Sequence, residues 1–324
     1  MTLGPKARAY IEERSTQESG GQPDYSIDGI GQLRESVKEL YKGLLADVTL
    51  PAGIESKKVA IDTLNVETTI YQPSDADKPM PVIIFHPGGG LALDMAAEHA
   101  HICAEMSIAA GAAVVCIQPP LSPETKFPEI LDASYNATKY FYENADKFQF
   151  DSQLFFLSGY SMGGTLAALI TNRSRVDNDL NISGQVIISG VLDIANPPKT
   201  AGEDFMFNLD RHTQFIDMCL PKDTTVESIK GDENYSPLAA NLAGLPPTIL
   251  ITGGNDALRE DTRKFYKALK QAGVDTSMVE NPFDIHTTLL MHNKIGDGRH
   301  AAILAGEEIA DVISQPTSSC TWCC

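Results

Sequence analysis

The 324-residue chain has few basic residues for its size. Its 25 lysines and arginines face 43 aspartates and glutamates, which gives a formal net charge of −18 at pH 7. Because no basic stripe offsets this charge, we expect no nucleic-acid partner. The same balance gives no reason to expect binding to an anionic membrane surface. The charge pattern is typical of an acidic soluble protein.

Long apolar stretches are missing as well. No segment is long enough to span a membrane, so no transmembrane segment is predicted. Residues 1–10 are polar, carry Lys6 and Arg8, and precede no apolar run of the kind found in a secretory signal peptide. The sequence therefore predicts a cytoplasmic protein.

The six cysteines lack the spacing of a disulfide framework or a zinc site. The cysteines therefore predict neither a disulfide scaffold nor a structural zinc site. Three cysteines lie in apolar surroundings and are predicted to be buried thiols: Cys103, Cys116 and Cys219.

The other three cysteines, Cys320, Cys323 and Cys324, crowd the last five residues. Thr321 at the fourth position from the end excludes a prenylation box of the C-a-a-X type. A terminal Cys-Cys pair resembles the tail of Rab-type GTPases, so lipid attachment at these cysteines, with membrane association, is one interpretation. We favour the other, in which residues 314–324 form a flexible tail without a role.

Short continuous apolar runs alternate with helix-like segments. The runs are 82–85, 113–117, 154–157, 186–188 and 248–251, followed by a strand-like segment at 276–280. The helix-like segments are 94–110, 128–146, 165–173, 258–272 and 299–313. Runs of this kind suit strands buried on both faces, which predicts a mostly parallel sheet with helices on both sides. Before them, 59–64 and 68–71 predict a β-hairpin.

Two regions stand outside this alternation. Residues 30–45 form the second of two predicted N-terminal helices, because their apolar residues recur at helical spacing. The interval 195–240 holds several aromatic residues without a clean strand. We predict that both regions fold over the carboxyl edge of the sheet.

The most informative motif is Gly159-Tyr160-Ser161-Met162-Gly163-Gly164, which lies between a predicted strand and a predicted helix. In this context G-x-S-x-G indicates a nucleophile elbow, a strained turn that projects the serine hydroxyl. Its glycines permit the close approach that the turn requires. Ser161 is therefore the candidate nucleophile.

A serine nucleophile needs a base, and the base needs an orienting carboxylate. Among seven histidines, His286 follows the last strand-like segment in a loop at the sheet edge, which favours it as the base. His292 and His300 are weaker candidates, since one lies in a helical run and the other begins the final helix. The remaining four, His86, His99, His101 and His212, lie out of the expected order or in the predicted insertion.

The candidate acid is Asp256, where a buried strand runs into a glycine-rich turn and then a helix. A helix N-cap is the competing interpretation of this residue. Asp193 is the second candidate, and Asp261 and Asp284 are less well placed.

An oxyanion hole is predicted from His86-Pro87-Gly88-Gly89-Gly90, which directly follows a strand. Pro87 has no N–H, so the expected donors are Gly88 and Gly89. The N–H of Met162, next to the nucleophile, would be a third donor. A phosphate-binding loop is disfavoured because no G-K-[ST] follows the glycines.

Together these motifs resemble the hormone-sensitive-lipase family of carboxylesterases and lipases. The resemblance spans nearly the whole chain and is based on four segments. These are the glycine loop 86–90, the segment 118–128 ahead of a helix, the elbow 159–164, and the segment 256–259 that holds the candidate acid, with His286 after it.

The resemblance implies an α/β-hydrolase fold with a mostly parallel central sheet, helices on both faces and a helical cap. It implies one domain over 1–324 with cap elements at about 1–50 and 195–240. It also implies hydrolysis of short- to medium-chain carboxylic esters through Ser161, His286 and Asp256 and an acyl-enzyme intermediate, without a metal or a cofactor. The expected partner is a small acyl ester, and a homodimer is left open.

The chain departs from the family pattern beside the nucleophile. Tyr160 replaces an acidic residue and Met162 a small one, which either narrows the acyl pocket or changes only the packing. The usual His-Gly-Phe becomes His286-Thr287-Thr288, and Pro87 enters the glycine loop.

Other functions remain open on the same fold. Receptors that have lost hydrolysis, such as the plant gibberellin receptor, resemble this chain in loop and cap but lack the catalytic histidine, so His286 favours an enzyme. A thioesterase, a peptidase or an acyltransferase would use the same residues.

Overall fold

A computed structural model describes residues 3–17, 27–61, 63–64, 66–196, 209–296 and 300–314. The cysteines near the C-terminus and the segment 197–208 of the predicted insertion lie outside these ranges.

One eight-stranded sheet runs through the molecule in the order β1-β2-β4-β3-β5-β6-β7-β8. The strands are β1 (Ile54–Val59), β2 (Glu67–Pro73), β3 (Met80–His86), β4 (Ala113–Gln118), β5 (Phe150–Tyr160), β6 (Gly184–Ile188), β7 (Thr248–Gly253) and β8 (Thr276–Asn281). Neighbours from β4 to β8 pair in parallel, whereas β1 and β2 pair antiparallel with each other and β2 pairs antiparallel with β4. The predicted α/β-hydrolase fold with a mostly parallel sheet is thus confirmed.

The central strands form because their side chains are apolar on both faces. Every residue of β4, β6 and β7 is buried. The predicted hairpin was correct as a pairing but wrong in its first strand, which ends at Val59 instead of beginning there. β1 is Ile54-Glu55-Ser56-Lys57-Lys58-Val59, with exposed residues between half-buried ends. It lies at the sheet edge, and so it lacks the apolar run that identifies a buried strand.

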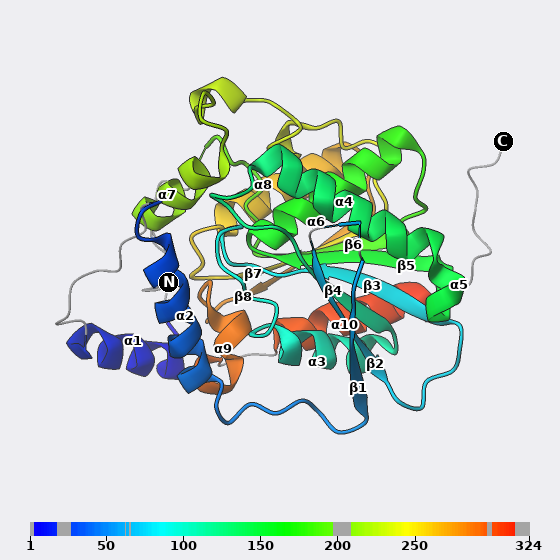
Figure 1. The fold of residues 1–324 in the computed structure, drawn as a ribbon, viewed down its shortest axis with the longest axis horizontal. Helices are drawn as coiled ribbons and strands as arrows, with labels where there is room; N and C mark the ends of the chain where they lie inside the picture. The colour runs from blue at the N-terminus through cyan, green and yellow to red at the C-terminus, as the bar shows by residue number, and fades with distance from the viewer. Residues whose placement is uncertain are drawn as a thin grey trace.

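Helices cover both faces of the sheet (Figure 1). One face packs against α4 (Phe127–Glu143), α6 (Met162–Asp177) and α8 (Arg259–Gln271). The other packs against α3 (Ala100–Ala110), α9 (Thr288–Ile295) and α10 (Ala301–Ser314). A short helix, α5 (Ala145–Phe148), follows α4. The helix predicted from 94 begins only at Ala100, because 93–99 is a turn region.

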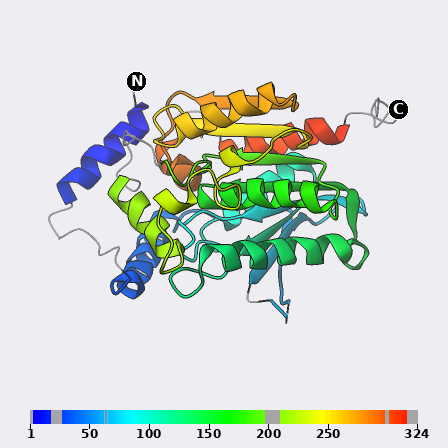
Figure 2. The same cartoon turned by 90° about the horizontal axis from the view of Figure 1, so that it is seen from above.

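The remaining helices gather at one end of the sheet, as both views show (Figures 1 and 2). They are α1 (Pro5–Gln17), α2 (Ile30–Leu44) and α7 (Leu209–Cys219). Two short 3₁₀ turns follow α7, at Glu227–Ile229 and Pro237–Ala239. None of the described helices is long and apolar enough to cross a membrane.

Candidate active site

The elbow around Ser161 is a tight turn from β5 into α6. Ser161 has φ 57° and ψ −126°, a conformation that non-glycine residues rarely adopt and that a surrounding structure must enforce. A Cβ on Gly159 would collide with the backbone of Gly163, and a Cβ on Gly163 would collide with the His86 carbonyl. The two glycines are therefore what lets the elbow approach the β3 loop.

His286 lies in the loop after β8, and its ring reaches the nucleophile. Its Nε2 lies 3.1 Å from the Ser161 Oγ. Both side chains are buried. A hydroxyl and an imidazole nitrogen at this distance can share a proton, which is the geometry of general-base activation.

Asp256 stands behind the histidine. Its carboxylate oxygens lie 3.0 and 3.1 Å from the His286 Nδ1, and Oδ1 also accepts the Leu258 N–H at 2.8 Å. An Nδ1–H held by a carboxylate leaves Nε2 as the basic nitrogen. The competing N-cap role is not met, because the N-cap residue of α8 is Leu258 and it has no side-chain cap bond.

The other candidate acids and bases have other partners. The Asp193 carboxylate accepts hydrogen bonds from the Asn196 side chain at 2.9 and 3.0 Å. Asp261 pairs with Lys264 at 3.2 Å. His300 pairs with Glu105, its Nδ1 lying 2.6 Å from the carboxylate, and its ring packs edge-on against His292.

The glycine loop after β3 bends beside the nucleophile. The N–H of Gly88, an expected oxyanion donor, points at the Nε2 of His99 over 3.4 Å. Gly89 and Gly90 line the pocket of Ser161, as does Met162. Their N–H groups donate to no backbone carbonyl in the part of the chain that the structure describes.

Sequence reasoning set His99 and His212 aside because of their position in the chain. His99 is fully buried, and its Nδ1 lies 2.7 Å from the Met95 carbonyl, so Nε2 is the acceptor for Gly88. Burial lowers the pKa of His99 to about 3, which keeps the ring neutral. The order of the triad motif carries no information on such supporting histidines, and no sequence signal identified them.

The pocket in front of Ser161 has a volume of about 110 Å³. Its lining is mostly apolar and comes from α2, the glycine loop, the elbow, α7 and the loop after β8. From α7, His212 and Phe215 enter this lining. Burial, with the nearby His286 second, lowers the pKa of His212 to about 4. The pocket thus presents neutral groups around the serine.

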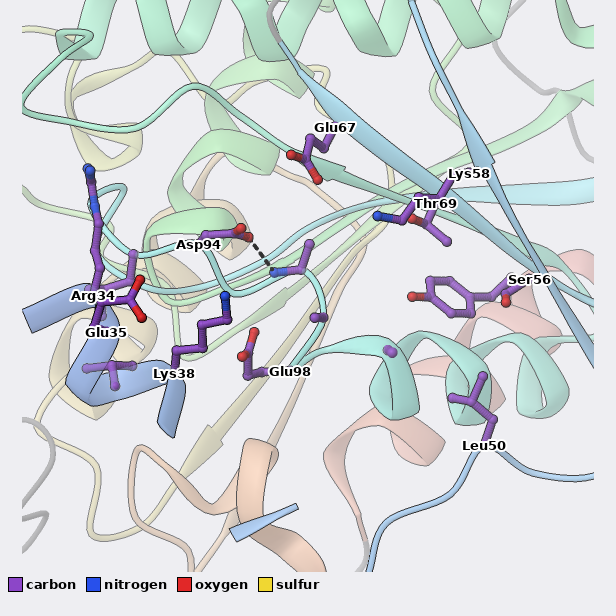
Figure 3. A pocket seen from close by; sticks show the side chains of 16 residues that line it. Arg34, Glu35, Lys38, Leu50, Ser56, Lys58, Glu67, Thr69, Asp94 and Glu98 are labelled. Atoms are coloured by element: carbon purple, nitrogen blue, oxygen red, sulfur yellow. Dashed lines mark hydrogen bonds between the residues drawn. The ribbon is translucent and has the colours of Figure 1, made fainter. Parts of the chain in front are cut away.

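Figure 3 shows a larger hollow of about 640 Å³. It adjoins the pocket of Ser161, because Val37 and Leu93 line both. Charged side chains of both signs line it, among them Lys38, Glu67 and Glu98. Burial raises the pKa of Glu98. Ser161 and His286 do not line this hollow, so the chemistry belongs to the smaller pocket.

No group of three or more metal-ligating side chains occurs within the described ranges. The three predicted buried thiols, Cys103, Cys116 and Cys219, are buried and free, which confirms that prediction.

Residues 82–290 match a family model described as alpha/beta hydrolase fold. Among curated proteins, the chain is 26% identical to the carboxylesterase NlhH of Mycobacterium tuberculosis, over 81% of this chain and 82% of that one. It is also 26% identical to an arylesterase of Saccharolobus solfataricus, over 96% of this chain and 99% of the other.

The fold resembles a solved hyperthermophilic esterase from Pyrobaculum calidifontis, with a TM-score of 0.86 and 24% identity. The superposition covers 97% of this chain and 99% of that chain. These findings confirm the resemblance to the carboxylesterases of the hormone-sensitive-lipase type that the motifs had predicted.

Proposed function

The chain belongs to the alpha/beta hydrolase fold family as a carboxylic ester hydrolase, and we propose that Ser161, His286 and Asp256 form its catalytic triad. The observation that carries the proposal is the continuous set of contacts from the Ser161 hydroxyl through the His286 ring to the Asp256 carboxylate. Ser161 lies in the strained turn of the elbow, and both Ser161 and His286 line the pocket.

In the proposed acylation step, the Oγ–H bond of Ser161 breaks and its proton passes to the Nε2 of His286. The Oγ forms a bond with the ester carbonyl carbon, and the carbonyl π electrons move to the oxygen. Asp256 accepts a hydrogen bond from the Nδ1–H of His286 and so stabilises the imidazolium, without itself taking the proton. The imidazolium then protonates the leaving alcohol as the tetrahedral adduct collapses to the acyl-enzyme.

Deacylation repeats the same proton movements with water. His286 takes a proton from a water molecule, whose oxygen bonds to the acyl carbon. The carboxylic acid leaves as Ser161 regains its proton. No cofactor is needed in either half of this scheme.

The oxyanion would be stabilised by backbone N–H groups. Gly88 was an expected donor, but its N–H already has His99 Nε2 as acceptor. We therefore assign the role to Gly89 and Met162, with Gly90 as the third group at the pocket. Met162 is the first residue of α6, where a helix leaves its N–H groups available.

A small acyl ester is the substrate class that this pocket favours. An engineered cavity of about 150 Å³ holds benzene, so 110 Å³ suits an acyl group of only a few carbons. We therefore narrow the expected short- to medium-chain range to its short end. Helices α2 and α7 line the pocket from outside the sheet and would act as the cap.

The test replaces Ser161 by alanine and measures hydrolysis of p-nitrophenyl acetate and labelling by a fluorophosphonate. We expect turnover to fall by about 10³–10⁶-fold and the label to disappear, because the nucleophile is gone. Ser158→Ala is the matched control: its hydroxyl is buried in β5, the strand that ends at the elbow, without a hydrogen-bond partner among the described residues. A folded Ser161→Ala protein that keeps most of its activity would disprove the assignment.

The same label separates the enzyme from an inert receptor, since a receptor would not react. Turnover of acyl-CoA, amide and oxygen-ester substrates, compared side by side with hydrolysis and transfer products, separates an esterase from a thioesterase, a peptidase and an acyltransferase. A homodimer and lipid attachment near the C-terminus stay predictions, checked by light scattering and by intact mass from the native cell.

A further inference from the structure

Tyr160 contacts His286 in two ways. Its phenol O–H donates a hydrogen bond of 2.6 Å to the backbone carbonyl of His286. Its ring is stacked on the imidazole, with ring centroids 5.1 Å apart and 25° between the planes. Tyr160 is only 3% exposed, so both contacts are shielded from water.

The Tyr160 ring also contacts the glycine loop and His99, which supports that loop. The His99 ring lies 5.7 Å from it, centroid to centroid, at 50°. A Cβ on Gly88 would lie 2.7 Å from Cδ1 of Tyr160, so only glycine leaves room for the ring there. His99 in turn is fixed by Met95 and accepts from Gly88. The tyrosine therefore contacts both the base and the loop beside the nucleophile.

We propose that Tyr160 is a positioning residue for His286, an inference that rests on the proposed triad. Its hydroxyl holds the backbone of the histidine loop at the distance that brings Nε2 to 3.1 Å from Ser161. Its ring face stabilises the imidazolium, the cation that forms when the Oγ proton passes to Nε2. The tyrosine thus does more than narrow the pocket or fill space.

The two contacts have separable consequences. The hydroxyl acts on the position of the base and so affects kcat. The ring acts on the charge of the base: an aromatic face favours the protonated imidazole, so its removal makes the imidazole easier to deprotonate. The active form of the enzyme has a neutral His286. Removal of the Tyr160 ring therefore moves the acid limb of the pH profile of kcat to lower pH.

The experiment compares Tyr160→Phe and Tyr160→Leu with wild type, using p-nitrophenyl acetate between pH 5 and 9. For Tyr160→Phe we expect kcat to fall about 5–20-fold with KM within twofold, and the acid midpoint to stay unchanged. For Tyr160→Leu we expect a larger fall in kcat and an acid midpoint about 0.5 pH units lower.

Tyr135→Phe is the matched control, because its hydroxyl is also bonded, to Asp179 at 2.7 Å, but on α4 away from the pocket. It should leave kcat and the pH profile unchanged. If both Tyr160 variants keep kcat within twofold and the acid midpoint within 0.2 units, the tyrosine only fills space and the proposal is wrong.

Should Tyr160→Leu fail to fold, Tyr160→Phe still decides: an unchanged kcat overturns the proposal and a selective loss of kcat supports it. Failure of the triad itself is seen separately, as activity and fluorophosphonate labelling that survive Ser161→Ala. In that event His286 has no proton to receive, and the role of Tyr160 is overturned with it.

Discussion

Two buried aspartates beyond the carboxyl end of β7, Asp256 and Asp261, differ in the hydrogen-bond donors around their carboxylates. Asp256 has the His286 ring and the Leu258 N–H as donors. Asp261, in the first turn of α8, has Lys264 on one oxygen, while its Oδ2 is buried without a hydrogen-bond partner among the described residues. Burial raises the pKa of Asp261 to about 6. The difference lies in the donors available to each carboxylate.

The raised pKa of Asp261 makes the stability of the protein depend on pH. The folded carboxyl holds its proton up to about pH 6, whereas the unfolded one releases it near pH 4, so stability falls as pH rises through that window. Asp261→Asn should therefore stabilise the protein at pH 7 by up to about 3 kcal/mol and have little effect at pH 4. Urea unfolding at both pH values measures this.

The control for that prediction is Glu260→Gln on the same turn, where the carboxylate is exposed. It should change stability little and to the same degree at both pH values. An effect of Asp261→Asn that is equal at pH 4 and pH 7 would contradict the role given to its ionisation.

At the scale of elements, the Arg34 side chain of α2 bonds this helix to the body of the protein. The Arg34 guanidinium donates to the carbonyls of Ala92 at 2.8 Å and Ser122 at 2.7 Å, and to both oxygens of Glu124 at 2.8 Å. The hydrogen bonds that Arg34 donates to its carboxylate lower the pKa of Glu124. Because α2 carries Val37 and Tyr41 into the pocket, Arg34 helps to place one wall of the substrate site.

Arg34→Lys should loosen that wall, since an ammonium cannot serve a carboxylate and two carbonyls in one fork. We expect kcat/KM for p-nitrophenyl acetate to fall about 3–10-fold and hydrogen exchange in α2 to accelerate. Lys42→Ala on the same helix removes a positive charge from an exposed pair with Glu39 and should change neither. Equal effects of the two substitutions would refute this role of Arg34.

At the scale of the whole molecule, the pocket is assembled from segments far apart in the chain. α2 brings Val37, the glycine loop brings Gly90, and α7 brings Phe215, whose ring lies over Gly90. Its volume of about 110 Å³ is a property of this assembly and of no single segment.

We therefore predict a steep dependence on acyl length. kcat/KM for p-nitrophenyl esters should be highest from acetate to butyrate and at least tenfold lower for octanoate, because longer chains do not fit. Phe215→Ala should restore part of the octanoate activity by opening the α7 side. Equal activity on all lengths in the wild-type protein would show that the pocket does not limit the acyl group.

Much of the fold could be predicted because its signals are local. Continuous apolar runs identified the buried strands, and helical spacing identified α2. The edge strand β1 was misplaced, because a strand exposed along most of its length has no apolar run to recognise. The start of α3 was set too early, because residues 94–99 are helix-compatible but form a turn beside the glycine loop.

The sequence by itself determined the types and order of the chemical groups: the elbow glycines, a serine, then an aspartate and a histidine after buried strands. These patterns are short-range, so a single chain displays them. Only the tertiary structure decided that the Gly88 N–H meets His99, that Tyr160 stacks on His286, and that α2 and α7 line the pocket of Ser161. Those contacts join residues distant in sequence, and their energies depend on packing geometry, which no local pattern encodes.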